Sequence, residues 1–129
     1  MDRITYRVIY GDTDCGGVMY YANYLRLFEM GRTEYLRKRG LSYREIEDKW
    51  GILLPVIEVS VKYKASARYD DLLTIKTSLL EAKSYKVTFQ YEIWSEKNLL
   101  VEGKTTHVAI TKEGKVIKIP KEILEVLSK

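Results

Sequence analysis

The sequence predicts an α+β fold in which a five-stranded, largely antiparallel sheet wraps around one long helix. Three observations indicate it. Apolar side chains recur at three- and four-residue steps through 22–39, which is typical of a helix buried along one side. Much of the chain after residue 52 alternates polar and apolar side chains, as half-buried strands do. No βαβ crossover follows the first strand, which favours antiparallel pairing.

The first half of the chain predicts one strand, a loop and two helices. Residues 3–9 alternate and form the strand, whereas glycines and aspartates interrupt any regular element over 10–19. The long helix over 22–39 ends before Gly40. Ser42 and Glu45 have the spacing of a capping box, which predicts a short helix over 42–49 that Gly51 ends.

The second half predicts four more strands, over 52–64, 72–82, 85–95 and 99–111. Pro55 indicates a sheet edge or a bulge near the start of the first of these. The short turn at 95–98 makes the last strands a meander. A turn at 112–115, an extended piece at 116–119 and a helix opened by Pro120 complete the chain. Residues 1–129 therefore read as a single domain without repeats or linkers.

Composition narrows the class of protein. With 46% hydrophobic and 31% charged residues, the chain is not disordered. No run approaches the ~18 apolar residues of a membrane span, and the charged start does not look like a signal peptide. Cys15 is the only cysteine, which suits a reducing compartment, so we expect a cytoplasmic protein. The net charge of +4 is modest, and no nucleic-acid-binding motif accompanies it, so we expect no nucleic-acid partner.

The loop over 10–24 is where chemistry is most expected. Asp12 and Asp14 lie two residues apart beside a Gly-Gly step, and a helix begins shortly afterwards. A helix start offers unpaired N–H groups that can hold an oxyanion, and a nearby carboxylate can attack an acyl group or activate water. Asp and Gly also form ordinary turns. The residues alone leave both interpretations open, with the turn the simpler one.

Two segments carry a resemblance to a known family: Tyr10 to Tyr24 followed by Glu29, and Tyr63 followed by 65–73. Together they resemble the hotdog-fold acyl-CoA thioesterases, in the 4-hydroxybenzoyl-CoA thioesterase-like family and its Tol–Pal-associated branch. With the order of the strands, the likeness extends over about residues 3–125. It implies that the predicted α+β fold is a hotdog fold.

The resemblance also implies roles for three residues. Asp14 would be the catalytic carboxylate, as nucleophile or as general base for water. The backbone N–H near Tyr21 would polarise the thioester carbonyl. Glu29 would be a second polar group that faces the acyl pocket; alternatively it forms an ordinary ion pair with Arg26 or Arg32 on the helix surface.

The chain departs from this branch at Tyr21, where many relatives have histidine. The missing imidazole removes a candidate acid or base and leaves the main-chain donor. The only histidine, His107, lies in the last strand pattern with no metal or triad partner at a recognisable spacing, so we expect a structural histidine and no metal site. Asp12 and Asn23 are expected to brace the loop and the helix start, and Cys15 to be a bystander.

Coenzyme A requires cations for its phosphates. Lys62, Lys64 and Arg68 lie along or just after one predicted strand, and Lys83 with Ser84 lies at the hairpin that resembles the family's nucleotide site. Each is a candidate for binding the CoA phosphates, and each equally fits an ordinary surface residue. Because coenzyme A would be part of the substrate, no separate cofactor is expected.

The resulting hypothesis is an enzyme that hydrolyses short- or medium-chain acyl-CoA, or an aromatic acyl-CoA, to the free acid and CoA. The resemblance implies a homodimer with a continuous sheet and an active site at the interface, and tetramers are common among relatives. The alternative is a non-catalytic module of the same fold that binds acyl carrier protein or an envelope complex. A dehydratase of this fold is less favoured, because no suitable histidine lies near the helix start.

Overall fold

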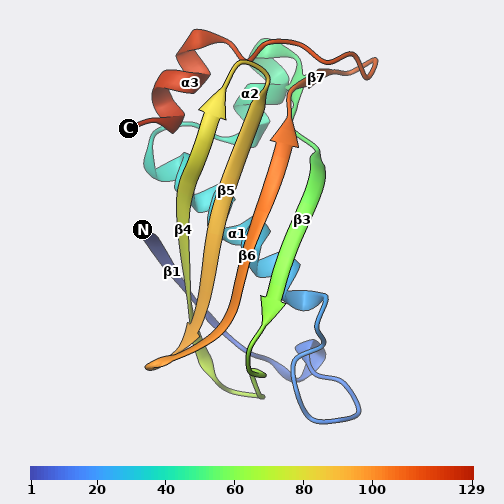
Figure 1. The fold of residues 1–129 in the computed structure, drawn as a ribbon, viewed down its shortest axis with the longest axis vertical. Helices are drawn as coiled ribbons and strands as arrows, with labels where there is room; N and C mark the ends of the chain where they lie inside the picture. Colours follow the sequence, from blue (N-terminus) through green and yellow to red (C-terminus); the bar gives the residue numbers. More distant parts are fainter.

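A five-stranded antiparallel sheet curves around the longest helix, as the sequence predicts (Figure 1). The computed structural model describes residues 1–129. Across the sheet the strands are β1 (Asp2–Arg7), β4 (Leu72–Lys83), β5 (Lys86–Ser95), β6 (Asn98–Val108) and β3 (Val56–Tyr63). A separate two-stranded ribbon pairs β2 (Ile52–Leu53) with β7 (Ile110–Thr111). The helices are α1 (Asn23–Lys38), α2 (Tyr43–Trp50) and α3 (Lys121–Leu127), with a 3₁₀ turn, η1 (Tyr10–Asp12).

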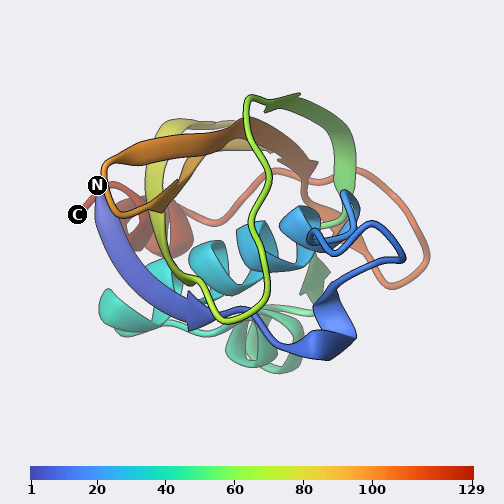
Figure 2. The same ribbon diagram turned by 90° about the horizontal axis from the view of Figure 1, so that it is seen from below.

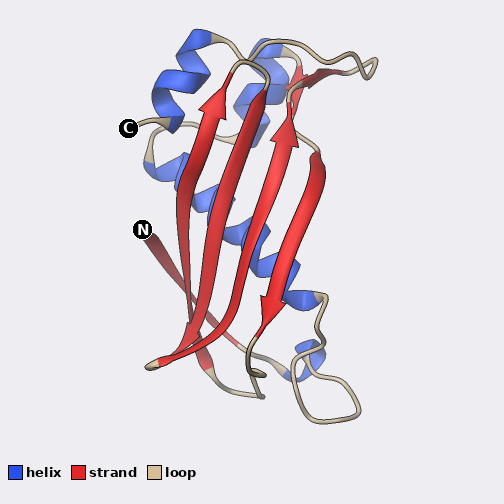
Figure 3. Ribbon diagram, viewed as in Figure 1, coloured by secondary structure: helices blue, strands red, loops and turns tan.

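Helix α1 fills the concave side of the sheet, as the view from below shows (Figure 2). The shorter helices α2 and α3 gather at the end of the sheet where β4 turns into β5 (Figure 3). No helix is both long and apolar enough to cross a membrane. The apolar stripe of α1 is the centre of the core, and its buried residues are Tyr24, Leu27, Phe28, Gly31, Tyr35 and Leu36.

Helix α2 begins and ends through the capping residues that the sequence predicts. The Ser42 hydroxyl accepts a hydrogen bond from the Glu45 N–H at 3.2 Å, and Gly51 ends the helix with a left-handed φ of 67°. Ser42 caps α2, so the helix itself runs one residue later than the predicted 42–49.

Two predicted strands are wrong as single elements. The stretch 52–64 is broken at Leu54 and Pro55, and its first residues leave the main sheet as β2. The stretch 99–111 is broken at the buried Ala109. Its N–H still donates to Tyr85 O in the register of the β5–β6 ladder, but the next residues, Ile110 and Thr111, pair with β2 as β7. Because both breaks occur at the same level of the sheet, the two short ends can pair with each other.

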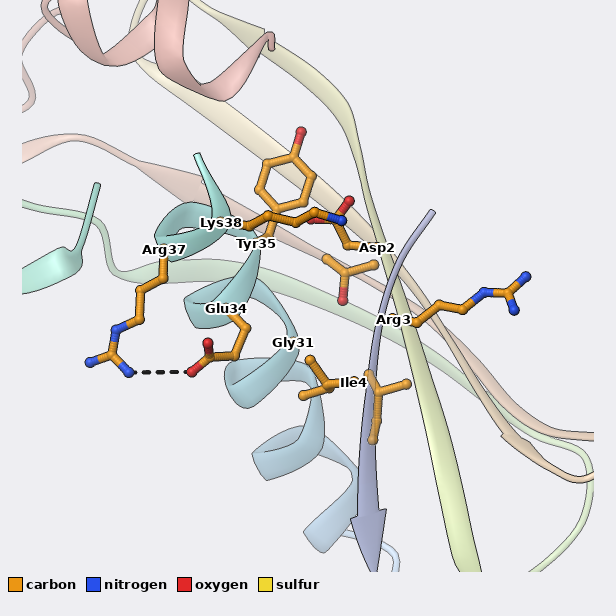
Figure 4. A pocket seen from close by; sticks show the side chains of 10 residues that line it. Asp2, Arg3, Ile4, Gly31, Glu34, Tyr35, Arg37 and Lys38 are labelled. Carbon is orange, nitrogen blue, oxygen red and sulfur yellow. Dashed lines mark hydrogen bonds and ion pairs between the residues drawn. The ribbon is translucent and has the colours of Figure 1, made fainter. Parts of the chain in front are cut away.

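At Gly31, α1 approaches the sheet closely, as Figure 4 shows beside Ile4 of β1. A Cβ at Gly31 would collide with the Thr77 hydroxyl of β4, which is buried and has no hydrogen-bond partner. A cavity of about 360 Å³ lies here between α1, β1 and β4. Glycine at this position therefore sets the spacing between the helix and the β1 side of the sheet.

Gly103 of β6 is a second close contact between α1 and the sheet. A Cβ there would lie 2.5 Å from the Phe28 ring and 3.0 Å from the backbone O of Ser60, and Phe28 is held by stacking on Tyr91 at 4.3 Å. Gly103→Ala should therefore lower the free energy of unfolding by about 2–3 kcal/mol in urea titration. Gly11→Ala, whose nearest neighbour would be 3.8 Å away, is the control. Equal stability of the two variants would contradict this packing argument.

His107 is part of a buried hydrogen-bond chain. Its Nδ1 lies 3.0 Å from Leu54 O, and its Nε2 lies 2.9 Å from the Thr105 hydroxyl, which is 2.5 Å from the Tyr91 hydroxyl. A carbonyl can only accept, so Nδ1 carries the proton and Nε2 accepts from Thr105. Thr105 then accepts from Tyr91. Every donor in this series of hydrogen bonds meets an acceptor only when the imidazole is neutral. This agrees with a structural role for His107.

Acid should destabilise the protein through this histidine. Burial lowers the pKa of His107 to about 4, and the charge of Arg32 also lowers it, against a rise from the bond to Leu54. Unfolded histidine has a pKa near 6.5, so the unfolded state binds the proton first as pH falls. Stability is fully present above about pH 6.5 and should fall by about 3 kcal/mol towards pH 4.

Urea unfolding at pH 7 and pH 4.5 measures this effect, and His107→Gln is the comparison, because glutamine does not titrate. The difference in stability between the wild type and the variant should shrink as pH falls. A difference that does not change with pH would contradict the assignment.

Candidate functional site

The loop between η1 and α1 is a tight hairpin that presents Asp14. Backbone bridges pair Thr13 with Met19 and Val18 with Arg68. At the tip, the Asp14 N–H donates to Val18 O at 2.9 Å, and the Gly17 N–H donates to Asp14 O at 3.0 Å. Gly17 has a φ of +78°, a conformation that favours glycine. The Gly-Gly step therefore supplies the turn that fixes the Asp14 backbone.

The Asp14 carboxylate is exposed and only half engaged. Its Oδ1 accepts a hydrogen bond from the Gly16 N–H at 2.8 Å, and its Oδ2 has no partner in the chain. The residue lines a cavity of about 290 Å³ together with Tyr21, Tyr24, Tyr63 and Lys64. One oxygen orients the side chain, which leaves the other free to act on a bound molecule.

Asp12, the other carboxylate of the loop, has a bracing role. It is 2% exposed and accepts hydrogen bonds from the Tyr6 hydroxyl at 2.8 Å and the Ile9 N–H at 3.0 Å. Burial raises the pKa of Tyr6, and the bond to Asp12 raises it further. The Asn23 side chain donates to Asp12 O at 2.9 Å. These bonds hold the loop to β1 and to the start of α1.

The start of α1 leaves donors unused beside Asp14. Its N-cap, Ala22, provides no side-chain hydrogen bond, and the N–H groups of Tyr21 and Ala22 donate to no acceptor in the chain. The Tyr63 hydroxyl donates to Tyr21 O at 3.2 Å, which ties this turn to β3. Unpaired N–H groups at a helix start can stabilise negative charge on a bound oxygen.

Tyrosine rings form the wall of the cavity. Tyr21 and Tyr24 each pack edge-on against Tyr63, with ring centroids 6.1 Å and 5.6 Å apart. The buried Tyr24 hydroxyl accepts from the Ala67 N–H at 2.9 Å. Burial raises the pKa of both Tyr24 and Tyr63, so these hydroxyls stay protonated near neutral pH. The cavity thus has an apolar wall with the carboxylate at its rim.

Glu29 does not share this cavity within one protomer. Its side chain is 73% exposed and lies 3.9 Å from Arg32, which is the ion pair expected from the spacing. It lines a second cavity, of about 490 Å³, between α1, α2 and the segment 53–55 just before β3. Asp14 and Glu29 therefore belong to different cavities of the single chain.

The candidate phosphate ligands are also dispersed within one protomer. Lys64 lines the Asp14 cavity and pairs with Glu102 at 3.1 Å, and Arg68 is bridged to Val18 beside it. Lys62 instead lines a different, polar cavity together with Glu102. Lys83 and Ser84 lie at the far end of β4, roughly 35–40 Å along the strand. The candidate phosphate ligands therefore do not form one cluster within a single chain.

Comparisons with known proteins identify the family of this chain. The model of the thioesterase-like superfamily matches residues 8–127. The acyl-CoA thioesterase YbgC of Haemophilus influenzae is 34% identical over 119 residues, which cover 91% of this chain and 87% of that protein. The structure of DHNA-CoA thioesterase from Staphylococcus aureus superposes with a TM-score of 0.91 at 32% identity, covering 98% of this chain and 87% of that one.

A structure with lower sequence identity has the same fold. The 4-hydroxybenzoyl CoA thioesterase of Pseudomonas superposes with a TM-score of 0.87 at 23% identity, covering 97% of each chain. The resemblance that the two sequence segments carry is confirmed. The chain has the hotdog fold and belongs to the thioesterase-like superfamily.

Proposed function

We propose that this protein hydrolyses the thioester of an acyl-CoA to the free acid and CoA. One observation carries the proposal: Asp14 and Tyr21 line the same cavity. There Asp14 has one carboxylate oxygen without a hydrogen bond, and Tyr21 has a backbone N–H without an acceptor. The names of the relatives, acyl-CoA thioesterase and DHNA-CoA thioesterase, support the same chemistry. Short- and medium-chain or aromatic acyl groups are the candidate substrates.

The proposed reaction uses Asp14 and the helix start together. The thioester oxygen accepts from the Tyr21 N–H, which makes the carbonyl carbon more electrophilic. As general base, Asp14 takes a proton from water while the hydroxide adds to that carbon. The C–S bond then breaks, and the proton passes from Asp14 to the departing sulfur. As nucleophile, Asp14 would instead form an acyl anhydride that water hydrolyses. The backbone donor serves either route, so the tyrosine at position 21 is compatible with both.

We also propose a homodimer that pairs β3 with its copy. β3 is an edge strand, and its Ile57, Val59 and Tyr63 side chains are 58%, 44% and 47% exposed. An open edge with exposed apolar side chains is a common site of strand pairing, and a two-fold axis would make the sheet continuous. Dimers could associate further into tetramers.

Pairing of β3 with its copy would bring the dispersed candidate phosphate ligands to one end of the continuous sheet. In an antiparallel pair, the end of β3 that carries Tyr63 and Lys64 lies beside the partner's opposite end. The partner's β4–β5 turn, with Lys83 and Ser84, then lies at the same end of the continuous sheet as Asp14. We propose that Lys62, Lys64 and Arg68 of one protomer, with Lys83 and Ser84 of the partner subunit, surround the CoA phosphates.

Thiol release from a panel of short, medium and aromatic acyl-CoAs tests the proposal. A thiol reagent should report turnover, and the activity should elute with the dimer in size-exclusion chromatography. If no thioester is cleaved, the hydrolase proposal fails. Binding of acyl carrier protein in that case would favour the non-catalytic alternative, which would act in the same proposed location, the cytoplasm.

A further inference from the structure

The second cavity, between α1, α2 and the segment 53–55, contains a buried cation whose charge is balanced by only one weak ion pair. The Arg32 side chain is 12% exposed, and its one ion pair is the 3.9 Å contact with the exposed Glu29. The Tyr43 hydroxyl, also on this cavity, is buried and makes no hydrogen bond of ordinary length, although the Arg32 guanidinium lies close enough to interact with it. Leu54 and Pro55 supply apolar lining. Polar groups buried this way are costly unless something pairs with them.

Neighbouring groups sense the charge of Arg32. It lowers the pKa of the Tyr43 and Tyr91 hydroxyls, although burial raises both, and it adds to the effect of burial in lowering the pKa of His107. Three arginines (Arg32, Arg37 and Arg44) and two glutamates (Glu29 and Glu47) line the cavity, so its lining has a small excess of positive charge. Its volume of about 490 Å³ is large enough for a small organic group.

Helix α2, which lines this cavity, and the loop that carries Asp14 lie at opposite ends of β3 (Figure 1). Pro55 precedes the strand and Lys64 follows it, so the two cavities of one chain are about 25 Å apart along the eight-residue strand. Antiparallel pairing of β3 with its copy would bring one end of the strand beside the opposite end of the other. The Arg32 cavity of each protomer would then adjoin Asp14 of its partner.

We propose that Arg32 and Tyr43 select acyl groups that carry an oxygen acceptor at the end far from the thioester, a carboxylate most strongly. The inference rests on the proposed hydrolysis and on the proposed pairing. A purely aliphatic tail would strip water from Arg32 and Tyr43 and return no hydrogen bond. A terminal hydroxyl would restore one, and a carboxylate would restore a charge-assisted bond to the guanidinium.

Three CoA thioesters of equal chain length test this selection: hexanoyl, 6-hydroxyhexanoyl and adipoyl. For the wild type, kcat/KM should rise in that order, by at least about tenfold from the first to the last. Arg32→Met keeps the length of the side chain and removes the charge. It should reduce the adipoyl-to-hexanoyl ratio to near one, by slowing adipoyl cleavage and sparing or improving hexanoyl cleavage.

Lys38→Met is the matched control. Lys38 is an exposed cation of the same helix, and it lines the cavity beside Gly31 rather than the Arg32 cavity (Figure 4). Its substrate ratio should stay at the wild-type value. Size-exclusion chromatography and thermal unfolding should be used to check that each variant is a folded dimer.

The outcomes separate the two proposals. Cleavage of all three thioesters with equal kcat/KM, or a ratio unchanged by Arg32→Met, would overturn the selectivity and leave the hydrolase proposal standing. No cleavage of any acyl-CoA would overturn the hydrolase proposal itself.

Discussion

Asp14→Asn should lower kcat for thioester hydrolysis by about a thousandfold and leave the fold intact. The amide has the size of the carboxylate, and its oxygen can still accept the hydrogen bond from the Gly16 N–H. It can neither take a proton from water nor form an acyl anhydride, so both routes open to Asp14 are lost. Steady-state thiol release with the substrate that the wild type cleaves best measures the effect.

The loss should appear in kcat with little change in KM, because the carboxylate acts on the reacting carbon rather than on CoA. Cys15→Ser is the control, since Cys15 is the exposed neighbour of Asp14 and the proposed reaction does not use it. It should keep the wild-type rate. Full activity of Asp14→Asn would mean that another group activates water, and the assignment of Asp14 would fail.

The fold was predictable because its main signals are local. The three- and four-residue spacing of apolar side chains in α1, and the capping of α2 by Ser42, depend on neighbours within a few positions. The break at Ala109 carried no such signal. Beyond it, Ile110 and Thr111 pair with Leu53 and Ile52, which lie far away in the sequence and which only the folded chain brings close.

The candidate site was predictable in part, for the same reason. Asp14, the glycine turn and the helix start lie within one short segment, so their proximity needs no tertiary information. The burial of Arg32 does not follow from its place in the sequence, because α2 and residues 53–55 line the cavity with it and are brought there only by the fold. The three-residue spacing from Glu29 to Arg32 predicts an ion pair, and this prediction is confirmed. The spacing carries no information about the cavity beside the pair.

Val59→Glu should convert the protein to monomers and abolish most of its activity. Val59 is 44% exposed on the edge strand and lies on the same face as Val61, which packs against the core. A single chain tolerates glutamate there, since water reaches the position. A two-fold pairing of β3 would bury both new carboxylates near each other, without partners and at a high cost in free energy.

The dimer dissociation constant should therefore rise at least about a hundredfold, because two unpaired charges each cost more than the 1.4 kcal/mol that corresponds to a factor of ten. Analytical ultracentrifugation measures this change, and thiol release at the same protein concentrations shows whether activity follows the dimer fraction. Thr5→Glu places the same charge at an exposed position on β1, the opposite edge of the sheet, and should change neither quantity. A dimeric, active Val59→Glu would exclude pairing through β3. A monomeric variant with full activity would instead place the complete site in one chain, and the role of the partner's Arg32 would fall with it.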